Sequence, residues 1–486
     1  MAEHDLVGEL DAFLDGHQGE LVEFRRDLHA HPEVGYSEHR TTRRVALRLE
    51  AAGLRPAILP RGTGMIVDIG GLPQDDPAVA LRADIDALPI VDEKAVPYRS
   101  LNVGACHACG HDVHTSILLG TGLFLARAAA AGALPGKVRL IFQPAEEVPG
   151  GALDVLAAGG ISSVDRVFAL HCDPKLDVGK IGTRTGPITA ACDKVKVQLS
   201  GPGGHTARPH LTADLVYGLG KIITELPAAL SRRIDPRSGL SLVWGRVSAG
   251  SASNAIPDFG VAEGTVRCLD DSAWHAVPEM LKDIVESVAS AYGVTADLSY
   301  ERSVPPAVNE ATCTAMVASA AERVLGGDSV TAAPQSLGGE DFAWYLESIP
   351  GSLFRLGTRR PGSADDFDIH QPMFDVDERC IEVGVKVMAA TALTAIGCIG
   401  DADSIGALGS PAAIGPVGSV GPVGSVGPVV PLSDDIALTG PLLAQGGPTS
   451  GSSGRARSQP PGRPPRPARR RRAMPPSQRI LWESTS

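Results

Sequence analysis

The sequence predicts an α/β protein whose main domain is interrupted by a smaller α+β domain. Short apolar runs bounded by glycine and proline alternate with helical patterns over residues 1–190 and again over 304–398, which is typical of a layered α/β fold. Residues 191–303 instead follow the order strand, helix, strand, strand, helix, strand. This order is that of a ferredoxin-like domain. We therefore expect a discontinuous α/β domain with a ferredoxin-like insert.

Three helices are predicted in the first segment of the main domain. Apolar residues recur at helical spacing over residues 6–31, where His31-Pro32 ends the pattern, and a second pattern runs from Thr41 to Gly53. The long apolar segment from His114 to Ala131 predicts a third helix, which ends at Gly132.

Four short apolar runs between these helices predict buried strands of a mainly parallel sheet: residues 64–69, 79–82, 138–142 and 167–170. Three of the runs are followed by polar residues, which are Asp84 and Asp86, Glu146 and Glu147, and His171. Sites in open α/β sheets form outside the carboxyl ends of the strands. We therefore expect these polar side chains to meet at one edge of the sheet.

The insert and the second segment of the main domain complete the predicted elements. The insert has strands over 195–199, 240–247, 259–267 and 295–300, and helices over 212–230 and 271–292. The main domain then resumes with a helix over 310–325, a short strand over 353–356 and a closing helix over 377–396.

Residues 399–486 are predicted to be a disordered tail. The run Gly-Pro-Val-Gly-Ser-Val begins at Gly415 and again at Gly421, and an arginine-rich stretch follows. Such proline-rich, low-complexity sequence does not form a packed core. From Gly400 onward there are nine Arg and five acidic residues, so the tail carries +4 and the rest −16 of the net charge of −12. The acidic body argues against nucleic acid as a specific partner.

The composition predicts a cytoplasmic protein without a membrane span. The eight cysteines have no regular spacing, so they do not indicate a disulfide framework. The first residues, Met-Ala-Glu-His-Asp, lack the apolar region of a secretory signal. No uninterrupted apolar run approaches the ~20 residues that cross a bilayer. Thiols in the cytoplasm stay reduced and available to metals.

Residues 105–114 contain two thiols, three imidazoles and a carboxylate, the chemistry of a metal site. Cys106-x-x-Cys109 is a weak zinc-ribbon signal, because no second pair follows it. A haem attachment motif would need a histidine where Gly110 stands. Cys109 and His111 are the better pair, since the glycine between them lets the backbone bend so that both reach one metal.

Three further stretches supply donors for the same site. Adjacent carboxylates such as Glu146 and Glu147 can divide roles, one binding a metal and the other acting as general base on a water molecule. His171 and His370 add two imidazoles. This set exceeds what one tetrahedral metal with an open position needs, and it suits two neighbouring metals. The thiolate favours Zn²⁺, and the carboxylate also suits Mn²⁺, with Co²⁺ or Ni²⁺ as further options.

Seven stretches together resemble the amidohydrolase branch of the aminoacylase/carboxypeptidase metallopeptidases. This branch includes hippurate hydrolases and plant indole-acetyl-amino-acid hydrolases. The resemblance covers about residues 10–398, with the motifs in the family's order. They are Leu81-Arg-Ala-Asp-Ile-Asp-Ala-Leu-Pro89, His107-Ala-Cys-Gly-His-Asp112, Phe142-Gln-Pro-Ala-Glu-Glu147, Gly203-Gly-His-Thr-Ala-Arg-Pro-His210, Asn254-Ala-Ile-Pro257, Gly264-Thr-Val-Arg267 and Gly339-Glu-Asp-Phe342.

The resemblance implies an aminopeptidase-like catalytic domain with a two-metal site. Its implied ligands are Cys109, His111, Glu147, His171 and His370. Glu146 would be the general base that activates water. Asp86 would orient the ligands, as residues around a metal site commonly do.

The resemblance also implies that the insert is a lid and homodimerisation domain. Its His205 would stabilise the oxyanion at the scissile carbonyl, within one chain or across the dimer. Asn254 and Arg267 would hold the substrate carboxylate, for which an arginine fork is suited. Gly338 and Gly339 would lie beside the substrate, although relatives often have serine at the position of Gly339. Relatives also often have methionine at the position of Cys106.

We expect metal-dependent hydrolysis of the amide bond of N-acyl amino acids or similar conjugates. Two alternatives remain open from the sequence. One is a dipeptidase or exopeptidase of the same fold. The other is a non-catalytic protein that binds a metabolite, although such a protein has no need of a positioned base such as Glu146.

Overall fold

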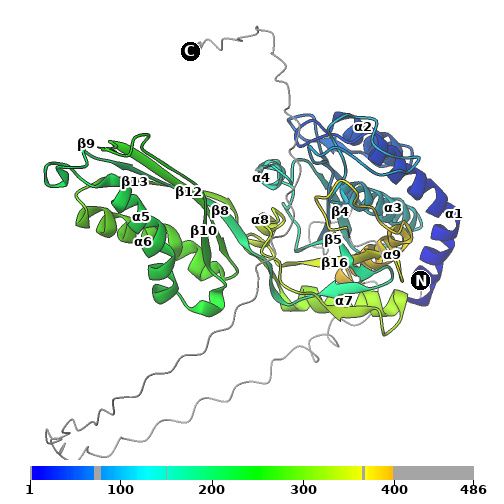
Figure 1. The fold of residues 1–486 in the computed structure, drawn as a ribbon. Helices are drawn as coiled ribbons and strands as arrows, with labels where there is room; N and C mark the ends of the chain where they lie inside the picture. Colours follow the sequence, from blue (N-terminus) through cyan, green and yellow to red (C-terminus); the bar gives the residue numbers. More distant parts are fainter. Residues whose placement is uncertain (1–2, 71–77, 149, 364–366, 398–486) are drawn as a thin grey trace, which may run out of the picture. The chain divides into compact units, whose positions relative to one another are not determined.

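The computed structural model describes residues 3–70, 78–148, 150–363 and 367–397. The predicted disordered tail lies outside the described residues. The family fold expected from the sequence, an α/β domain with a ferredoxin-like insert, is confirmed (Figure 1).

The main domain is built on an eight-stranded sheet in the order β1-β2-β4-β3-β5-β16-β6-β15. Its centre, β4-β3-β5-β16, is parallel, whereas β1, β2 and β6 make antiparallel pairs nearer the edges. The sheet is therefore mixed, because the predicted parallel pairing holds for its centre and for the edge pair β6-β15 but not for the other pairs. The strands are β1 Ala57–Ile58, β2 Met65–Ile69, β3 Ala78–Asp84, β4 Lys137–Gln143, β5 Arg166–Asp177, β6 Ile181–Thr183, β15 Val330–Ala332 and β16 Gly351–Arg359.

Helices cover both faces of this sheet, as β3 shows. Val79 and Leu81 belong to the large apolar core that includes α1, α3, α7 and α9, whereas Ala80 between them belongs to the core formed with α4 and α8. Every residue of β3 is buried, as expected for a central strand between two helical layers. The helices are α1 Glu3–Ala30, α2 His39–Glu50, α3 His111–Ala130, α4 Gly151–Ala157, α7 Ala311–Leu325, α8 Ala343–Leu346 and α9 Arg379–Ala395.

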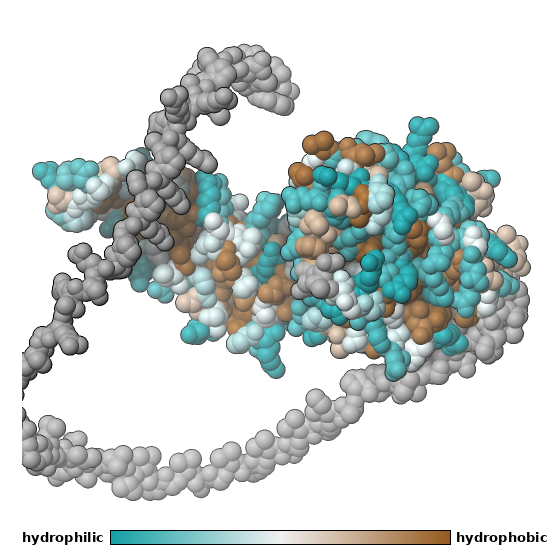
Figure 2. All heavy atoms as spheres, turned by 45° about the vertical axis from the view of Figure 1, so that its right-hand side comes forward, coloured by the Kyte–Doolittle hydropathy of each residue, from teal (hydrophilic) through white to brown (hydrophobic). Residues whose placement is uncertain are grey.

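Of the described helices, α3 alone has the length and apolar composition of a membrane span, but 78% of its most apolar window is buried inside the protein. It is a core helix, because it packs against α1 and α9 on one face of the sheet. On the face drawn in Figure 2, hydrophilic side chains cover most of the surface and hydrophobic areas interrupt them.

The insert is an antiparallel sheet in the order β10-β12-β8-β13 with two helices, α5 and α6 (Figure 1). Alternate residues Val195, Val197 and Leu199 of β8 pack into a core with these helices. The elements are β8 Ala191–Ser200, α5 Leu215–Arg233, β10 Ser241–Ala249, β12 Phe259–Cys268, α6 Asp271–Ala291 and β13 Thr295–Val304, with the small pieces β9 Gly204–His205, η1 Pro209–Leu211, η2 Pro236–Ser238 and β11 Ala255–Ile256.

The chain enters and leaves the insert through two paired strands. Strand β7, Gly186–Thr189, precedes the insert, and β14, Ala307–Asn309, follows it. The two strands pair antiparallel, with Thr189 opposite Ala307 and Gly186 opposite Asn309. We call this pair the neck.

One prediction about strand ends is wrong. His171 does not follow a strand but lies within β5, which continues to Asp177 because it pairs with β16 over this length. Arg82 of β3 is opposite Ala169 of β5, so His171 is level with the last residue of β3, Asp84. The polar residue therefore still lies at the carboxyl edge of the central strand.

Candidate metal centre

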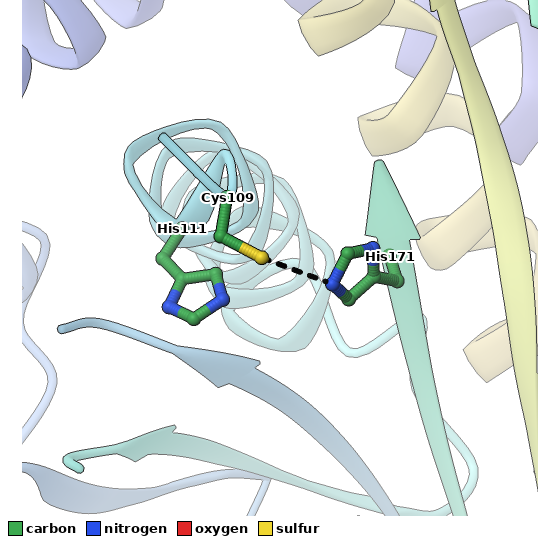
Figure 3. A group of neighbouring side chains, drawn as sticks. All are labelled: Cys109, His111 and His171. Atoms are coloured by element: carbon green, nitrogen blue, oxygen red, sulfur yellow. Dashed lines mark hydrogen bonds between the residues drawn. The ribbon is translucent and has the colours of Figure 1, made fainter. Parts of the chain in front are cut away.

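A glycine bend holds the first two donors, Cys109 and His111. Gly110 between them has φ of 89°, a left-handed conformation that costs glycine little. A Cβ at Gly110 would lie 2.8 Å from the Sγ of Cys172, so the site also has no room for a side chain. The bend leaves His111 as the first residue of α3, with donor atoms of Cys109, His111 and His171 all within 4.8 Å of one another (Figure 3).

His171 offers a bare ring nitrogen to this group. Its Nδ1 lies 2.8 Å from the carbonyl oxygen of Cys172, and its Nε2 lies 3.4 Å from the Sγ of Cys109. Because a carbonyl only accepts, Nδ1 carries the hydrogen and Nε2 has the free lone pair. Burial lowers the pKa of His171 well below its usual value, and the charge of Arg355 acts in the same direction. A neutral imidazole is the form that binds metals.

Asp86 orients both His111 and Glu147. The Nδ1 of His111 lies 3.1 Å from Oδ1 of Asp86 and 3.0 Å from its carbonyl oxygen, and Oδ2 of Asp86 accepts the backbone N–H of Glu147 at 3.0 Å. Asp86 is only 1% exposed. These contacts turn the Nε2 of His111 toward Glu147, whose Oε1 is 3.9 Å away.

His370 reaches Glu147 from a separate loop. The backbone N–H of His370, which has φ of 64°, donates to the carbonyl of Ala108 at 2.7 Å and ties this loop to the segment before Cys109. Its Nε2 then lies 3.3 Å from Oε1 of Glu147, close enough for an ion pair but outside hydrogen-bond geometry. Donor atoms of Cys109, Glu147 and His370 lie within 4.8 Å of one another.

The donor set fits two divalent ions. Among the described residues, the buried Nε2 of His111 and Oε1 of Glu147 have no hydrogen-bond partner, an arrangement that costs free energy unless an ion is bound. Burial also raises the pKa of the Cys109 thiol well above its usual value, so a thiolate there needs a cation beside it. Cys109 belongs to both donor groups and could serve both ions.

Glu146 lies beside these donors, and its carboxyl group has a raised pKa. Its carboxylate is within 4.8 Å of donor atoms of His111 and Glu147. Its Oε1 lies 3.5 Å from the backbone nitrogen of Asp341. Burial, together with the negative charges of Glu340, Glu147 and Asp341, raises the pKa of Glu146 well above its usual value. A raised pKa makes this carboxyl group hold a proton more firmly than an ordinary carboxylate, which suits a group that takes and returns a proton.

The neighbouring Glu147 shows the opposite shift. Burial alone would raise its pKa, but the adjacent imidazole of His370 and the charge of His111 lower the pKa below its usual value. The two adjacent carboxylates are therefore held in different electrostatic environments. The division between a ligand and a base stays a prediction.

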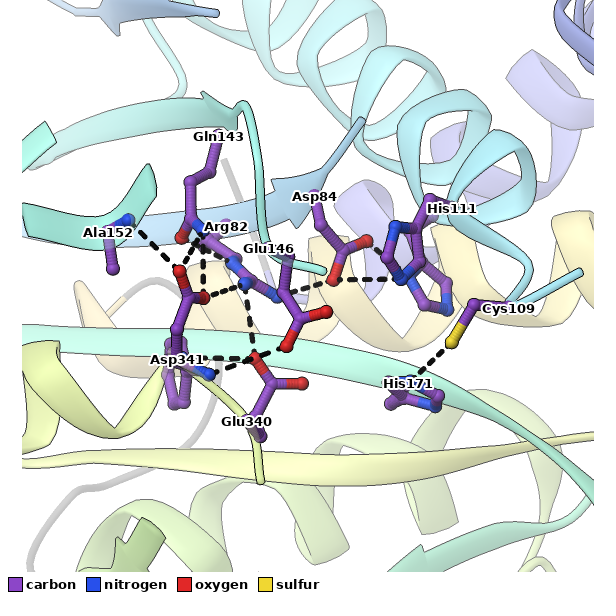
Figure 4. Close-up of polar contacts among 12 residues, drawn as sticks. Arg82, Asp84, Cys109, His111, Gln143, Glu146, Ala152, His171, Glu340 and Asp341 are labelled. Carbon is purple, nitrogen blue, oxygen red and sulfur yellow. Dashed lines mark hydrogen bonds and ion pairs between the residues drawn. The ribbon is translucent and has the colours of Figure 1, made fainter. Parts of the chain in front are cut away.

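The sequence reasoning missed a buried ion network beside Glu146 (Figure 4). The guanidinium of Arg82 donates to Oδ2 of Asp84 at 2.6 Å and to Oδ1 of Asp341 at 2.8 Å, and it lies 3.1 Å from Oε1 of Glu340. Arg82 is 1% exposed. Asp84 in turn contacts Nδ1 of His114 at 2.6 Å. Two of the quoted motifs contain these residues, and a charged residue inside the apolar strand β3 was the available signal.

A cavity of about 510 Å³ opens onto the donors. It is lined by four of the five predicted ligands (Cys109, Glu147, His171 and His370), by Glu146 and by the predicted substrate residues Arg267, Gly338 and Gly339. Arg267 donates from Nη1 to the carbonyl of Leu337. A Cβ at Gly339 would lie 2.9 Å from Cγ2 of Val304 and 3.1 Å from Cβ of Cys192, so a serine there would press on the base of the insert.

The predicted residues His205 and Asn254 of the insert do not line this cavity. Both are exposed. They are close to each other, because β9 pairs with β11 and places His205 opposite Ala255. The Nδ1 of His205 accepts the N–H of Ala207 at 3.0 Å.

Cys106, His107 and His114 are not among the five proposed ligands, although a ring nitrogen of His114 lies within 4.8 Å of one of His111. The Sγ of Cys106 is 3.4 Å from Nζ of Lys94, which also lies 3.0 Å from Oδ1 of Asp92, so a cation already occupies this spot. The Nε2 of His114 accepts the N–H of Cys172 at 2.9 Å. Burial lowers the pKa of His107 to about 3.

Comparison with known proteins gives the family. Residues 80–394 match the model of the peptidase family M20/M25/M40. N-acetylcysteine deacetylase of Bacillus subtilis (strain 168) is 38% identical over 377 residues, which are 77% of this chain and 97% of that protein. The putative glutamate–cysteine ligase 2-3 of Rhodococcus jostii (strain RHA1) is 47% identical over 371 residues, 76% of this chain; the match spans only 46% of that protein.

A solved structure supports the same assignment. The crystal structure of the Bacillus subtilis YXEP protein, described as a dinuclear metal binding peptidase from the M20 family, has a TM-score of 0.70 and 36% identity, and covers 79% of this chain and 100% of that one. The chain therefore belongs to the peptidase family M20/M25/M40 and is a metallo-hydrolase that acts on amide bonds.

Proposed function

We propose that the chain hydrolyses the amide bond of N-acyl amino acids with Glu146 as general base. The proposed ligands of two divalent ions are Cys109, His111, Glu147, His171 and His370. The observation that carries the proposal is the convergence of these five donors and Glu146 from four separate stretches of chain. Four of the donors and Glu146 line one cavity of about 510 Å³. The similarity to N-acetylcysteine deacetylase supports the substrate class.

The proposed chemistry depends on proton transfer by Glu146. Bound divalent ions would supply a Lewis acid that polarises the substrate carbonyl and lowers the pKa of a water molecule. Glu146 takes a proton from the attacking water and returns it to the leaving nitrogen. Its raised pKa favours the second transfer, and nearby cations favour its ionised form for the first.

The remaining residues are proposed to position the substrate. Arg267 lines the cavity and presents a guanidinium to the substrate's α-carboxylate, while Gly338 and Gly339 let the chain approach the substrate closely. His205 and Asn254 would complete the site from a second copy of the chain in a homodimer, since they do not line the cavity of their own chain.

The metal and the compartment are further proposals. Thiolate and imidazole donors favour Zn²⁺, the carboxylate donor also suits Mn²⁺, and Co²⁺ or Ni²⁺ are alternatives. Elemental analysis of the purified protein would identify the metal. A cytoplasmic location stays a prediction.

The test of the catalytic role is the substitution Glu146→Gln, which keeps the size of the side chain and removes its basicity. We expect a loss of about 10²–10⁴-fold in kcat on N-acetyl amino acids, with unchanged metal content. Glu347→Gln is the matched control, because this carboxylate does not line the cavity. Full turnover by Glu146→Gln would remove Glu146 from the role of base.

A substrate series tests the proposed class. N-acetyl, N-benzoyl and longer N-acyl derivatives of one amino acid are compared with dipeptides of the same amino acid, using the metal-loaded enzyme. We expect hydrolysis of one or more N-acyl amino acids. Cleavage of the dipeptides alone would replace the proposal with a dipeptidase function.

A further inference from the structure

Arg355 is a cation of the cavity that the proposed chemistry does not use. It lies on β16 and is partly buried, and it belongs to the cavity lining. Among the residues that the structure describes, its guanidinium makes neither an ion pair nor a hydrogen bond. A partly buried charge without a partner is unfavourable. An anionic ligand bound to Arg355 would therefore lower the free energy of this charge.

The sheet directs Arg355 toward the metal donors. Arg355 is opposite His171 in the parallel pair of β16 with β5, and residues in register on neighbouring strands project from the same face. His171 faces Cys109, so Arg355 projects to the same side. Gly182 on β6 is opposite Arg355 on the other flank, where a Cβ would lie only 3.1 Å from the Cβ of Arg355.

The other cations of the cavity already have partners. Nζ of Lys175 lies 3.2 Å from Oδ2 of Asp368, and Arg267 donates to the carbonyl of Leu337. Arg355 therefore has a free planar fork of donors, which matches a carboxylate in shape and charge. With Arg267 proposed to hold the α-carboxylate of the substrate, Arg355 would serve a different group.

We propose that Arg355 binds a second carboxylate of the substrate and so selects N-acyl amino acids that carry an additional acidic group. This inference rests on the proposed function, because it assumes that an N-acyl amino acid occupies the cavity. The second carboxylate belongs to the acyl chain or to the amino-acid side chain, and the experiment separates these two sources.

The test compares three substrates. N-acetylalanine has no second carboxylate, N-succinylalanine has one on the acyl chain, and N-acetylglutamate has one on the amino-acid side chain. The readout is the ratio of kcat/KM for each dicarboxylate to that for N-acetylalanine. For the wild type we expect a ratio of about 10–100 for one of the two dicarboxylates, because a charge-assisted hydrogen bond to the substrate gives a preference of this size. Arg355→Met should bring that ratio close to one, and Arg355→Gln serves if the first variant does not fold.

Two controls keep this test specific. Lys175→Met removes another cation of the cavity rim and should preserve the ratio. Metal content must be equal in all variants, which excludes an effect through His171. A ratio that stays high in the Arg355 variants overturns the inference, and so does a wild-type ratio near one for both dicarboxylates with active hydrolysis of N-acetylalanine. An enzyme that cleaves none of the three substrates overturns the proposed function as well.

Discussion

The metal-donor edge of the main domain and the tip of the insert differ in how firmly their side chains are held. At the donor edge, Asp86 is buried and fixes both His111 and Glu147. At the tip of the insert, His205 and Asn254 are exposed, and their hydrogen bonds are to backbone within the paired segments β9 and β11 and the turns beside them. The buried contacts show that the donor edge is preorganised within one chain. The tip lacks such support, and we expect a second copy to provide it.

Removal of metal from the donor edge is expected to cause the largest loss of activity. A chelator is expected to abolish activity, because the donors of the edge are arranged for cations, and adding Zn²⁺ or Mn²⁺ should restore it. The melting temperature should fall in parallel, since a ligand that binds the folded state stabilises it. Activity assays and thermal unfolding of the same samples would measure both. A metal-free enzyme with full activity would contradict the metal mechanism.

His205→Ala is expected to have the next largest effect. It should lower kcat by about 10²–10³-fold, as removal of an oxyanion donor usually does. Metal content should not change, because His205 is exposed on the insert and is not one of the proposed ligands.

Mixing subunits tests where His205 acts. If it acts across a homodimer, mixing His205→Ala with the inactive Glu146→Gln protein should recover about one quarter of wild-type activity, since half of the dimers are mixed and each has one intact site. No recovery after subunit exchange would place His205 in its own chain.

A smaller effect is expected for Asp86→Ala. Loss of the group that orients His111 and Glu147 should weaken metal affinity by about 10–100-fold. Asn254→Ala is the matched variant from the tip of the insert, and its metal affinity should equal that of the wild type. Titration with a competing chelator would measure both. Equal affinities in the two variants would mean that the edge does not depend on Asp86.

The smallest effect on turnover is expected for His29→Gln, which changes the pH dependence of stability. Burial of His29 opposes its charged form, but Asp112, 2.7 Å away, raises its pKa to about 9. Protonated His29 therefore stabilises the folded state fully below pH 6.5, its pKa in the unfolded chain. This stabilisation is lost as the pH rises toward 9. We expect a loss of about 3 kcal/mol in the free energy of unfolding over this range.

Urea unfolding at pH 6.5, 7.5 and 9 would measure this change. The His29→Gln variant should show a flatter profile over the same range, because it no longer takes up the proton. Identical slopes for the two proteins would contradict the assignment.

The elements that could be predicted were those with strong local patterns. β3 and β4 contain short apolar runs, residues 78–81 and 140–142, and α3 is a long apolar segment. The full length of β5 was not predictable, because its second half is polar and is a strand only through pairing with β16. The short strands β6, β7, β14 and β15 depend in the same way on distant partners, as does the mixed direction of the sheet.

The site shows the same division between local and distant information. Cys109, His111 and Glu147 lie in short motifs whose residue types indicate metal chemistry, whereas His171 and His370 are single histidines in the sequence. The structure brings the five together. The roles of Arg82 and Arg355 depend on partners far along the chain. Arg82 meets Asp341 across a separation of 259 residues, and Arg355 is notable only because its neighbours leave it unpaired.

The neck makes the insert an exchangeable cassette. Its two strands are direct neighbours, so the ends of the main domain on either side of the insert already meet at Thr189 and Ala307. A short turn across this gap would remove residues 190–306 and leave all five proposed ligands and Glu146 in place. Recombination at the neck would therefore let one hydrolytic core acquire different lids, and with them different substrates, without any change to its metal donors.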